Sequence, residues 1–485
     1  MYEYTSVNFF DMSVWRSILL VGVLFCSLLL ANILKNFIPA LKKTLIPNSV
    51  LGGIMLLIAS TICYYTTGSY LFNQPALSAN GSGIATLEML TYHCLAIGFI
   101  AMTLRPVQKK LSRDRYIDIL DSGVTTIGGY MIQGIFGLAI TIVAAFIISD
   151  FAPGSGVLLS FGYGQGTGQA LTTGKNFDLG MGLNGTYASF GLAIAALGFL
   201  TAGIVGVFYL NYLRRKGEIR VFDKEKSSAL GMNEVISENE TPMNESVDKM
   251  SIQVAFVFVA YLLAYGLMYL IGNVILGGGS NLIGTIYGFN FLFGVIAAVI
   301  VKGVLNFLTK KGLVRYEHKN TFLLNRISGF AFDLMIVAGI CAIQVHVISN
   351  YWFLLLLLGL VGAVITFLYV RLVCKKVFPD YEHEQFLVFF GMLTGTASTG
   401  MILLREADPD FESPASENLV YQNFPAIVLG FPLLIIATRL YTNARNIPLA
   451  IALLAVIFAI FVALNLFLFR KFIFRKKTVG ADNGK

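Results

Sequence analysis

The chain is poor in charged residues and in the residues that usually bind metals or form disulfides. Only 13% of its 485 residues are Asp, Glu, Lys or Arg, and it has 4 histidines and 5 cysteines. The cysteines have no CxxC or other metal-ligand spacing, so we interpret them as small buried residues. The sequence also lacks H-E-x-x-H, G-x-S-x-G and paired carboxylates within an apolar span, which argues against an enzyme.

Apolar residues dominate what is present. They make up 56% of the chain, the mean hydropathy is +0.73, and apolar runs reach the about 20 residues that cross a bilayer core. The net charge of +8 is spread over short blocks between these runs instead of one basic stripe, which argues against nucleic-acid binding. We therefore predict an all-α polytopic membrane protein.

Eleven apolar segments are candidate transmembrane helices. The first is followed by lysines rather than by a cleavage site, so we expect it to be retained as a helix and not removed as a signal peptide. The eleven predicted spans are Val14–Leu34, Val50–Tyr64, Leu87–Leu104, Ser122–Ile148, Ser189–Leu213, Ile252–Ile271, Ile283–Leu308, Ile327–Val345, Tyr351–Leu372, Leu419–Leu440 and Ile447–Phe469.

Basic residues collect on alternate connections between these spans. The positive-inside bias places such blocks in the cytoplasm, which predicts an external N-terminus and a cytoplasmic C-terminus. The six blocks are Lys35/Lys42/Lys43, Arg105/Lys109/Lys110/Arg113/Arg115, Arg214/Arg215/Lys216, Lys310/Lys311/Arg315/Lys319/Arg326, Arg371/Lys375/Lys376 and Arg470/Lys471/Arg475/Lys476/Lys477.

Two further apolar segments, about 155–172 and 385–405, are rich in glycine. If either crossed the membrane, the following basic blocks would lie outside, against the charge bias. Irregular backbone at membrane depth requires protein or water to satisfy its polar groups. We therefore predict two re-entrant loops, the first entering from outside and the second from the cytoplasm.

The two loops share a sequence pattern. LLSFGYGQGTGQA at 158–170 and LVFFGMLTGTAST at 387–399 both contain L-x-x-F-G-x-x-x-G-T. Each follows four spans and precedes a fifth, so the odd number of crossings gives the two halves inverted topology. This predicts a first repeat at 1–213, a polar and flexible cytoplasmic linker at 214–250, a second repeat at 251–440, and an extra helix with a basic tail at 441–485.

Inverted repeats with discontinuous backbone are typical of secondary transporters. A broken helix offers free N–H groups to an anion, and carbonyl and hydroxyl oxygens to Na⁺. The alternative is that these glycines only allow helices to pack closely. The candidate substrate-binding residues are Gly162, Gly164, Gln165, Gly166, Thr167, Gly168, Gly391, Thr394, Gly395, Thr396, Ser398, Thr399 and Arg405. The candidate sodium ligands are Asp333, Thr167 and Thr396.

Several other polar residues admit two interpretations. Lys175 and Arg405 each follow a loop and are either counter-charges for a carboxylate or interfacial anchors, Arg405 then pairing with Glu406 or Asp408. His93 is better explained by a hydrogen bond between helices than by a function. The polar residues Asp121, Gln133, Asn184 and Asn423 either complete a site or hold helices together.

The layout and both loop motifs resemble the bacterial glutamate/sodium symporter family, although neither loop contains that family's Gly-Gly pair. The resemblance implies a homodimer in the bacterial inner membrane that imports L-glutamate or a related carboxylate with Na⁺. It implies no cofactor besides the coupling ion, and movement of a substrate-carrying unit against a static scaffold. The alternatives are a di- or tricarboxylate symporter, a cation/proton exchanger and an ion channel.

Overall fold

The computed structural model describes residues 9–42, 44–105, 113–219, 249–277, 283–311, 320–408 and 413–470. No strand occurs within these ranges. The long helices are α1 (Met12–Phe37), α3 (Asn48–Thr67), α4 (Gly83–Leu104), α5 (Arg113–Ile147), α8 (Thr186–Lys216), α9 (Lys249–Tyr269), α11 (Asn290–Lys310), α12 (Thr321–Cys341), α14 (Trp352–Val377), α18 (Asn423–Thr442) and α19 (Ile447–Leu468).

Shorter helices connect or interrupt the long ones. They are α2 (Pro39–Lys42), α6 (Leu158–Gln165), α7 (Thr167–Met181), α10 (Ile283–Gly288), α13 (Val345–Ile348), α15 (Glu382–Leu393), α16 (Ala397–Ala407) and α17 (Ala415–Tyr421). A π-helical segment, Leu270–Ile275, extends α9. Short 3₁₀ turns include Pro153–Val157, which leads directly into α6.

Ten helices in the described ranges are long and apolar enough to cross a membrane, so the chain is an all-helical, multi-pass membrane protein. The remaining predicted span, 419–440, is formed by two helices. There α17 ends before Gln422, and α18 runs from Asn423 to Thr442 with Pro432 inside it. The greater part of the predicted linker, 220–248, and of the basic tail, 471–485, lies outside the described residues.

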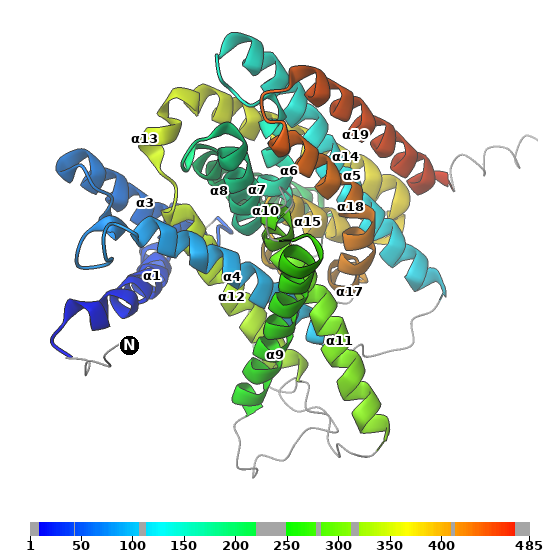
Figure 1. Cartoon of the computed structure of the whole chain (residues 1–485). Coiled ribbons are helices and arrows are strands. Elements are labelled where there is room, and N and C mark those ends of the chain that lie inside the picture. The colour runs from blue at the N-terminus through cyan, green and yellow to red at the C-terminus, as the bar shows by residue number, and fades with distance from the viewer. Residues whose placement is uncertain are drawn as a thin grey trace, which may run out of the picture.

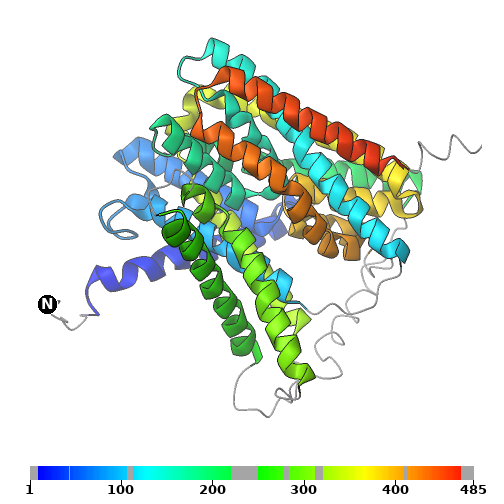
Figure 2. The ribbon, with the colours of Figure 1, turned by 45° about the vertical axis from the view of Figure 1, so that its right-hand side comes forward.

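The helices pack as two bodies (Figures 1 and 2). The first, which we call the scaffold body, contains α1, α3, α4, α9, α11 and α12, with α4 and α12 as its closest pair. The second, the hairpin body, contains α5 to α8 and α14 to α19. The two bodies meet mainly where α4 and α12 contact α7.

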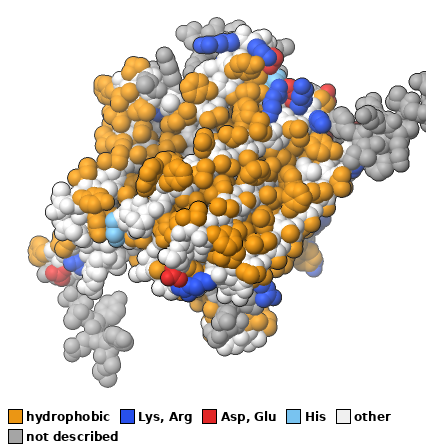
Figure 3. Space-filling view, turned by 90° about the horizontal axis from the view of Figure 1, so that it is seen from above, with side chains coloured by type: hydrophobic (Ala, Val, Ile, Leu, Met, Phe, Trp, Pro, Cys, Tyr) orange, Lys and Arg blue, Asp and Glu red, His pale blue; other side chains and the backbone are white. Residues whose placement is uncertain are grey.

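Hydrophobic side chains cover most of the molecular face seen in Figure 3, and Lys and Arg side chains gather toward its edges. Large exposed apolar residues are frequent on several helices, for example Leu29 on α1 (66% exposed) and Leu262 on α9 (70%). Such continuous apolar cover suits lipid rather than water.

Candidate functional site

The first glycine-rich segment forms a helical hairpin. Helices α6 and α7 are separated only by Gly166, whose φ of +78° and ψ of −169° are accessible to glycine and hardly to any other residue. Both arms pack on the same part of α8, because a Cβ built on Gly191 would lie 2.8 Å from the Ala170 carbonyl oxygen and 3.2 Å from Leu158 Cδ2. The chain therefore enters and returns at one end of α8.

The second glycine-rich segment is also a hairpin, at the other end of α8. Helices α15 and α16 are joined through residues 394–396, and Thr396 is extended, with a φ of −139°. A Cβ built on Gly206 would lie 2.8 Å from Leu403 of α16, and the rings of Tyr209 and Phe386 of α15 are 4.4 Å apart. Both arms thus pack on the C-terminal half of α8.

The two hairpin tips meet near the middle of α8. A Cβ on Gly198 would lie 2.6 Å from the Thr394 carbonyl oxygen and 3.1 Å from Tyr163 Cδ2, so both tips reach this level. A Cβ on Gly166 would lie only 3.2 Å from Thr396 Cγ2. The hairpins therefore approach from opposite ends and touch.

Irregular backbone in the first segment is confined to Gly166, so the segment predicted as a re-entrant loop is a helical hairpin with a single break. Gly162, Gly164 and Gly168 are helical and serve close packing instead. Cβ atoms at these positions would lie 2.8 Å from Ile194, 2.4 Å from Tyr130 and 2.8 Å from Leu95. The helix-packing interpretation holds for these three glycines, because in each case a neighbouring side chain occupies the space of a Cβ.

Two helix N-termini lie at the junction of the tips. Neither α7 nor α16 has a side-chain cap. Their first intrahelical bonds run from Ala170 N–H to Gly166 O (3.2 Å) and from Gly400 N–H to Thr396 O (3.1 Å). The amides of the three preceding residues of each helix therefore have no partner within the helix, which gives each tip a positive dipole end.

Gln133 of α5 ties the second tip to the body of the protein. Its Nε2 donates to the Leu393 carbonyl oxygen (2.8 Å) and to Thr366 Oγ1 of α14 (2.9 Å). Its Oε1 has no hydrogen-bond partner among the described residues and would lie 3.0 Å from a Cβ on Gly164 of the first tip. The side chain is fully buried, so one amide lies between the two tips.

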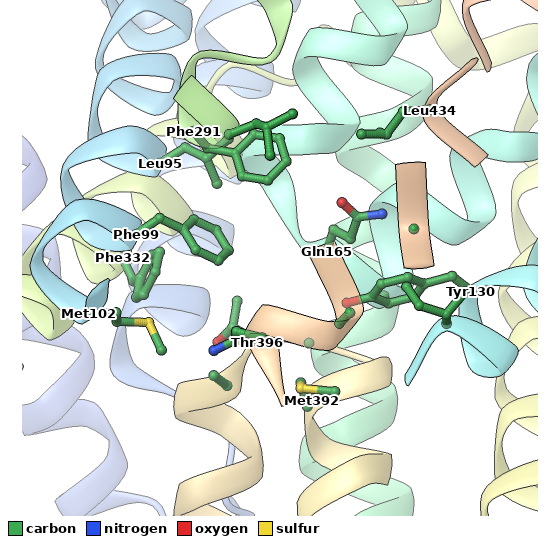
Figure 4. Close-up of a pocket in the computed structure, with 18 of the residues that line it drawn as sticks. Leu95, Phe99, Met102, Tyr130, Gln165, Phe291, Phe332, Met392, Thr396 and Leu434 are labelled. Carbon is green, nitrogen blue, oxygen red and sulfur yellow. The ribbon is translucent and has the colours of Figure 1, made fainter. Parts of the chain in front are cut away.

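A cavity of about 100 Å³ lies between the tips and the scaffold body. Figure 4 shows Phe99 and Phe332 on one side of it and Gln165, Thr396 and Tyr130 on the other. The scaffold body contributes Leu95, Phe99, Met102, Phe291, Leu292, Phe332 and Met335. The hairpin body contributes Ile127, Tyr130, Gly164, Gln165, Met392, Gly395, Thr396, Ala397, Asn423, Ala426, Gly430, Leu433 and Leu434.

Four of the predicted substrate residues line this cavity, namely Gly164, Gln165, Gly395 and Thr396. Others belong to the tips and hairpin arms without lining it: Gly162, Gly166, Thr167, Gly168, Gly391, Thr394, Ser398 and Thr399. Thr167 Oγ1 donates to the Met335 carbonyl oxygen of α12 (3.3 Å), and Thr396 Oγ1 lies 3.4 Å from Thr399 Oγ1. The second pair places two hydroxyls in the first turn of α16.

The predicted charged residues lie away from the cavity lining. Asp333 is exposed on α12, whereas its neighbours Phe332 and Met335 face the cavity. Arg405 is exposed on α16, and the adjacent Glu406 pairs with Arg214 (3.1 Å). Lys175 pairs with Glu88 of α4 (2.8 Å), which accounts for its charge without a substrate.

Among the other polar candidates, His93 forms the expected hydrogen bond between helices, to the Tyr261 hydroxyl of α9 (2.5 Å). Asp121 accepts a hydrogen bond from Arg470 after α19 (2.8 Å). Asn423 lines the cavity and donates to the Val420 carbonyl oxygen (3.3 Å). Asn184 lies exposed in the turn before α8.

Sequence reasoning missed Tyr130 and the apolar wall of the scaffold body. Tyr130 lies one helical turn before Gln133, so the spacing of the two polar side chains on α5 was an available signal. Phe99, Phe291 and Phe332 come from three separate helices and have no motif that distinguishes them from core residues. Only the packing of α4, α11 and α12 brings them together.

No protein-family model matches this chain, and no curated protein matches it. The fold and the site define its class on their own, as a multi-pass helical membrane protein in which two broken helices meet at a cavity.

Proposed function

We propose that this protein is a sodium-coupled secondary transporter that imports a small carboxylate anion by alternating access. The observation that carries the proposal is the meeting of two opposed broken-helix hairpins, one from each half of the chain, at a cavity between two helical bodies. Discontinuous helices at a repeat interface are the usual setting of substrate and ion sites in such transporters.

The uncapped N-termini of α7 and α16 support an anionic substrate. A positive dipole end at each tip attracts a carboxylate without a basic side chain, and α16 begins at the cavity lining with Thr396 and Ala397. Gln165 and Thr396 add an amide and a hydroxyl at the same place. Glutamate, which the family resemblance implies, remains a prediction within this class.

Oxygen atoms at the tips support Na⁺ as the coupling ion. Thr396 and Thr399 bring two hydroxyls within 3.4 Å of one another, and the last carbonyl groups of α6 and α15 end at the same junction. Hard oxygen ligands of this kind suit Na⁺ in transporters with unwound helices. Importing an anion against an inside-negative potential costs about 2.3 kcal/mol per charge per 100 mV, so we expect more than one cation per anion.

Helix packing favours two inverted repeats, residues 1–213 and 251–440. Helix α3 of the first half packs on α12 of the second, and α11 of the second half packs reciprocally on α4 of the first. We propose an external N-terminus, a cytoplasmic linker, a homodimer in a bacterial inner membrane, and movement of the hairpin body against the scaffold body. The scaffold wall of the cavity is wholly apolar, whereas outside the cavity such a movement would break the ion pair between Lys175 of α7 and Glu88 of α4.

Uptake into proteoliposomes containing the purified full-length protein tests the proposal. An inward Na⁺ gradient should stimulate uptake of at least one carboxylate several-fold over an equal K⁺ gradient, and the Gly166→Ala variant should lose this stimulation. The matched control is Gly303→Ala on α11, where a Cβ meets no atom within 4 Å. No Na⁺ stimulation for any carboxylate would reject the coupling, and rapid flux that needs no gradient would favour a channel.

A further inference from the structure

The cavity between the tips and the scaffold body has no charged lining. Among the described residues that surround it, none is Lys, Arg, His, Asp or Glu. Its polar side chains are those of Tyr130, Gln165, Thr396 and Asn423, all on the hairpin body. Opposite them, Leu95, Phe99, Phe291 and Phe332 present only hydrocarbon. The polar side chains of the site therefore all lie on the side of the hairpin body, and the scaffold side is wholly apolar.

Several charged residues of the hairpin arms already have protein partners. Lys175 pairs with Glu88 (2.8 Å), and Arg214 pairs with Glu406 (3.1 Å). Asp178, near the end of α7, accepts backbone N–H groups at the start of α8. A second carboxylate on a substrate would thus meet no cation in the cavity, and an ammonium group would meet no acid. Burying either charge unpaired is costly.

The size of the cavity limits the apolar part of the substrate. An apolar cavity of about 150 Å³ holds a benzene ring, whereas this cavity measures about 100 Å³. Met102, Met335 and Met392 line it, and their flexible thioether side chains can adjust to a branched alkyl group. The space suits a short aliphatic chain better than an aromatic ring.

From this lining we infer that the substrate is a monocarboxylate with a short, branched apolar body and no second charge. The inference rests on the proposed transport function and narrows its substrate class. The carboxylate lies toward the tips, between Gln165 and Thr396, and the alkyl group lies against Phe99 and Phe332 of the scaffold body.

Two matched pairs of solutes test this substrate class in proteoliposomes of the full-length protein. Ketoisovalerate and ketoglutarate share a keto-acid head, but only ketoglutarate has a second carboxylate. Valine and glutamate repeat the comparison with an ammonium group. We expect Na⁺-stimulated uptake of ketoisovalerate, with kcat/KM at least about tenfold higher than for ketoglutarate, valine or glutamate.

The outcomes separate this inference from the proposed function. Na⁺-stimulated uptake of ketoglutarate, valine or glutamate at an efficiency equal to or above that of ketoisovalerate would overturn the substrate class and leave the transporter standing. Na⁺ stimulation for another carboxylate but for none of these four solutes would also overturn the substrate class, whereas no stimulation for any carboxylate would reject the transport proposal itself.

A cation placed in the cavity should reverse the preference. Leu434 of α18 lines the cavity and is 8% exposed, so a Leu434→Arg variant would offer a partner to a second carboxylate. We expect the ratio of ketoisovalerate to ketoglutarate efficiency to fall by at least about tenfold, and Leu434→Met to retain the wild-type preference. A folded Leu434→Arg variant with an unchanged ratio would contradict the claim that the lack of a cation in the lining excludes a second carboxylate. If this variant does not fold, competition between the two keto acids on the wild-type protein decides the preference.

Discussion

The two hairpin tips reach the same junction with different backbones. The first tip turns at one residue, Gly166, in a conformation reserved for glycine, and its neighbours Tyr163 and Thr167 are fully buried. The second tip turns over residues 394–396 without a positive φ, and Thr396 is half-buried beside the cavity. The comparison teaches that a shared F-G-x-x-x-G-T motif specifies where a helix breaks but not how. We expect the first tip to be rigid and the second to be the more adaptable one.

The largest expected effect follows from the difference between the two motif glycines. Gly166→Ala forces a residue with a Cβ into the glycine conformation and should cost about 1–3 kcal/mol of strain at the tip. We expect at least about tenfold lower Na⁺-driven uptake. Gly395→Ala needs no positive φ, although its Cβ would lie 2.9 Å from Thr399 Oγ1, so its effect should be smaller. An equal loss of Na⁺-driven uptake in the two variants would contradict the expected difference between the two tips.

The outer end of the first hairpin should be the next most sensitive position. The buried carboxylate of Asp178 accepts N–H groups of Gly185 (3.2 Å), Tyr187 (2.8 Å) and Ala188 (3.1 Å), which fixes α7 to the start of α8. Asp178→Asn should lower the free energy of unfolding by about 2–3 kcal/mol, because hydrogen bonds to a charged acceptor are lost. Thermal unfolding in detergent measures this loss.

The control for that measurement is Asp150→Asn. The Asp150 side chain is 83% exposed and pairs with Arg445 (3.4 Å), so its loss should change stability by less than about 1 kcal/mol. A similar fall in stability for both variants would show that the hydrogen bonds accepted by Asp178 do not fix the hairpin.

Gln133 offers a way to loosen the second tip alone. In Gln133→Leu the buried Leu393 carbonyl oxygen loses its donor, which should destabilise the protein by about 1–2 kcal/mol. Thr366→Val removes one acceptor of the same amide and should have the smaller effect. A stability loss for Thr366→Val as large as for Gln133→Leu would contradict this. It would show that the hydrogen bond from Gln133 to α14, and not the one to the tip, stabilises the protein.

The smallest effects should come from the basic residues that follow each hairpin. Lys175→Gln removes a partly exposed pair with Glu88, and Arg405→Gln changes an exposed side chain outside the cavity. Each should change the KM for substrate by less than about threefold. A rise in KM of about a hundredfold in one variant would identify that residue as a counter-charge for the carboxylate.

Much of this arrangement could be predicted from local pattern. Hydropathy located ten of the spans, since a long apolar run has few alternatives to a membrane helix. The repeated G-T step located both turns, at Gly166 and before Thr396. The predicted span 419–440 corresponds to α17 and α18, and its apolar pattern did not indicate the junction at Gln422 between the two helices.

Other features depend on tertiary packing and escaped prediction. Whether Gly164 breaks a helix or packs against Tyr130 depends on a residue more than thirty positions away. Asp333 was expected at the site. Neighbouring residues of a helix point in different directions, and on α12 Phe332 faces the cavity whereas Asp333 does not. The apolar wall required the mutual positions of three helices, which no local pattern encodes.

Solute protection of a cysteine at the second tip tests most directly that the meeting tips form the binding site. In a background in which the five native cysteines are replaced, the Thr396→Cys variant is labelled with a thiol reagent, and Ser398→Cys, outside the cavity lining, is the control. Ketoisovalerate and glutamate are added in turn. The account predicts that Na⁺ with a bound carboxylate slows labelling of the Thr396→Cys variant several-fold, and that K⁺ with the same carboxylate does not. Equal labelling rates under all conditions would contradict it.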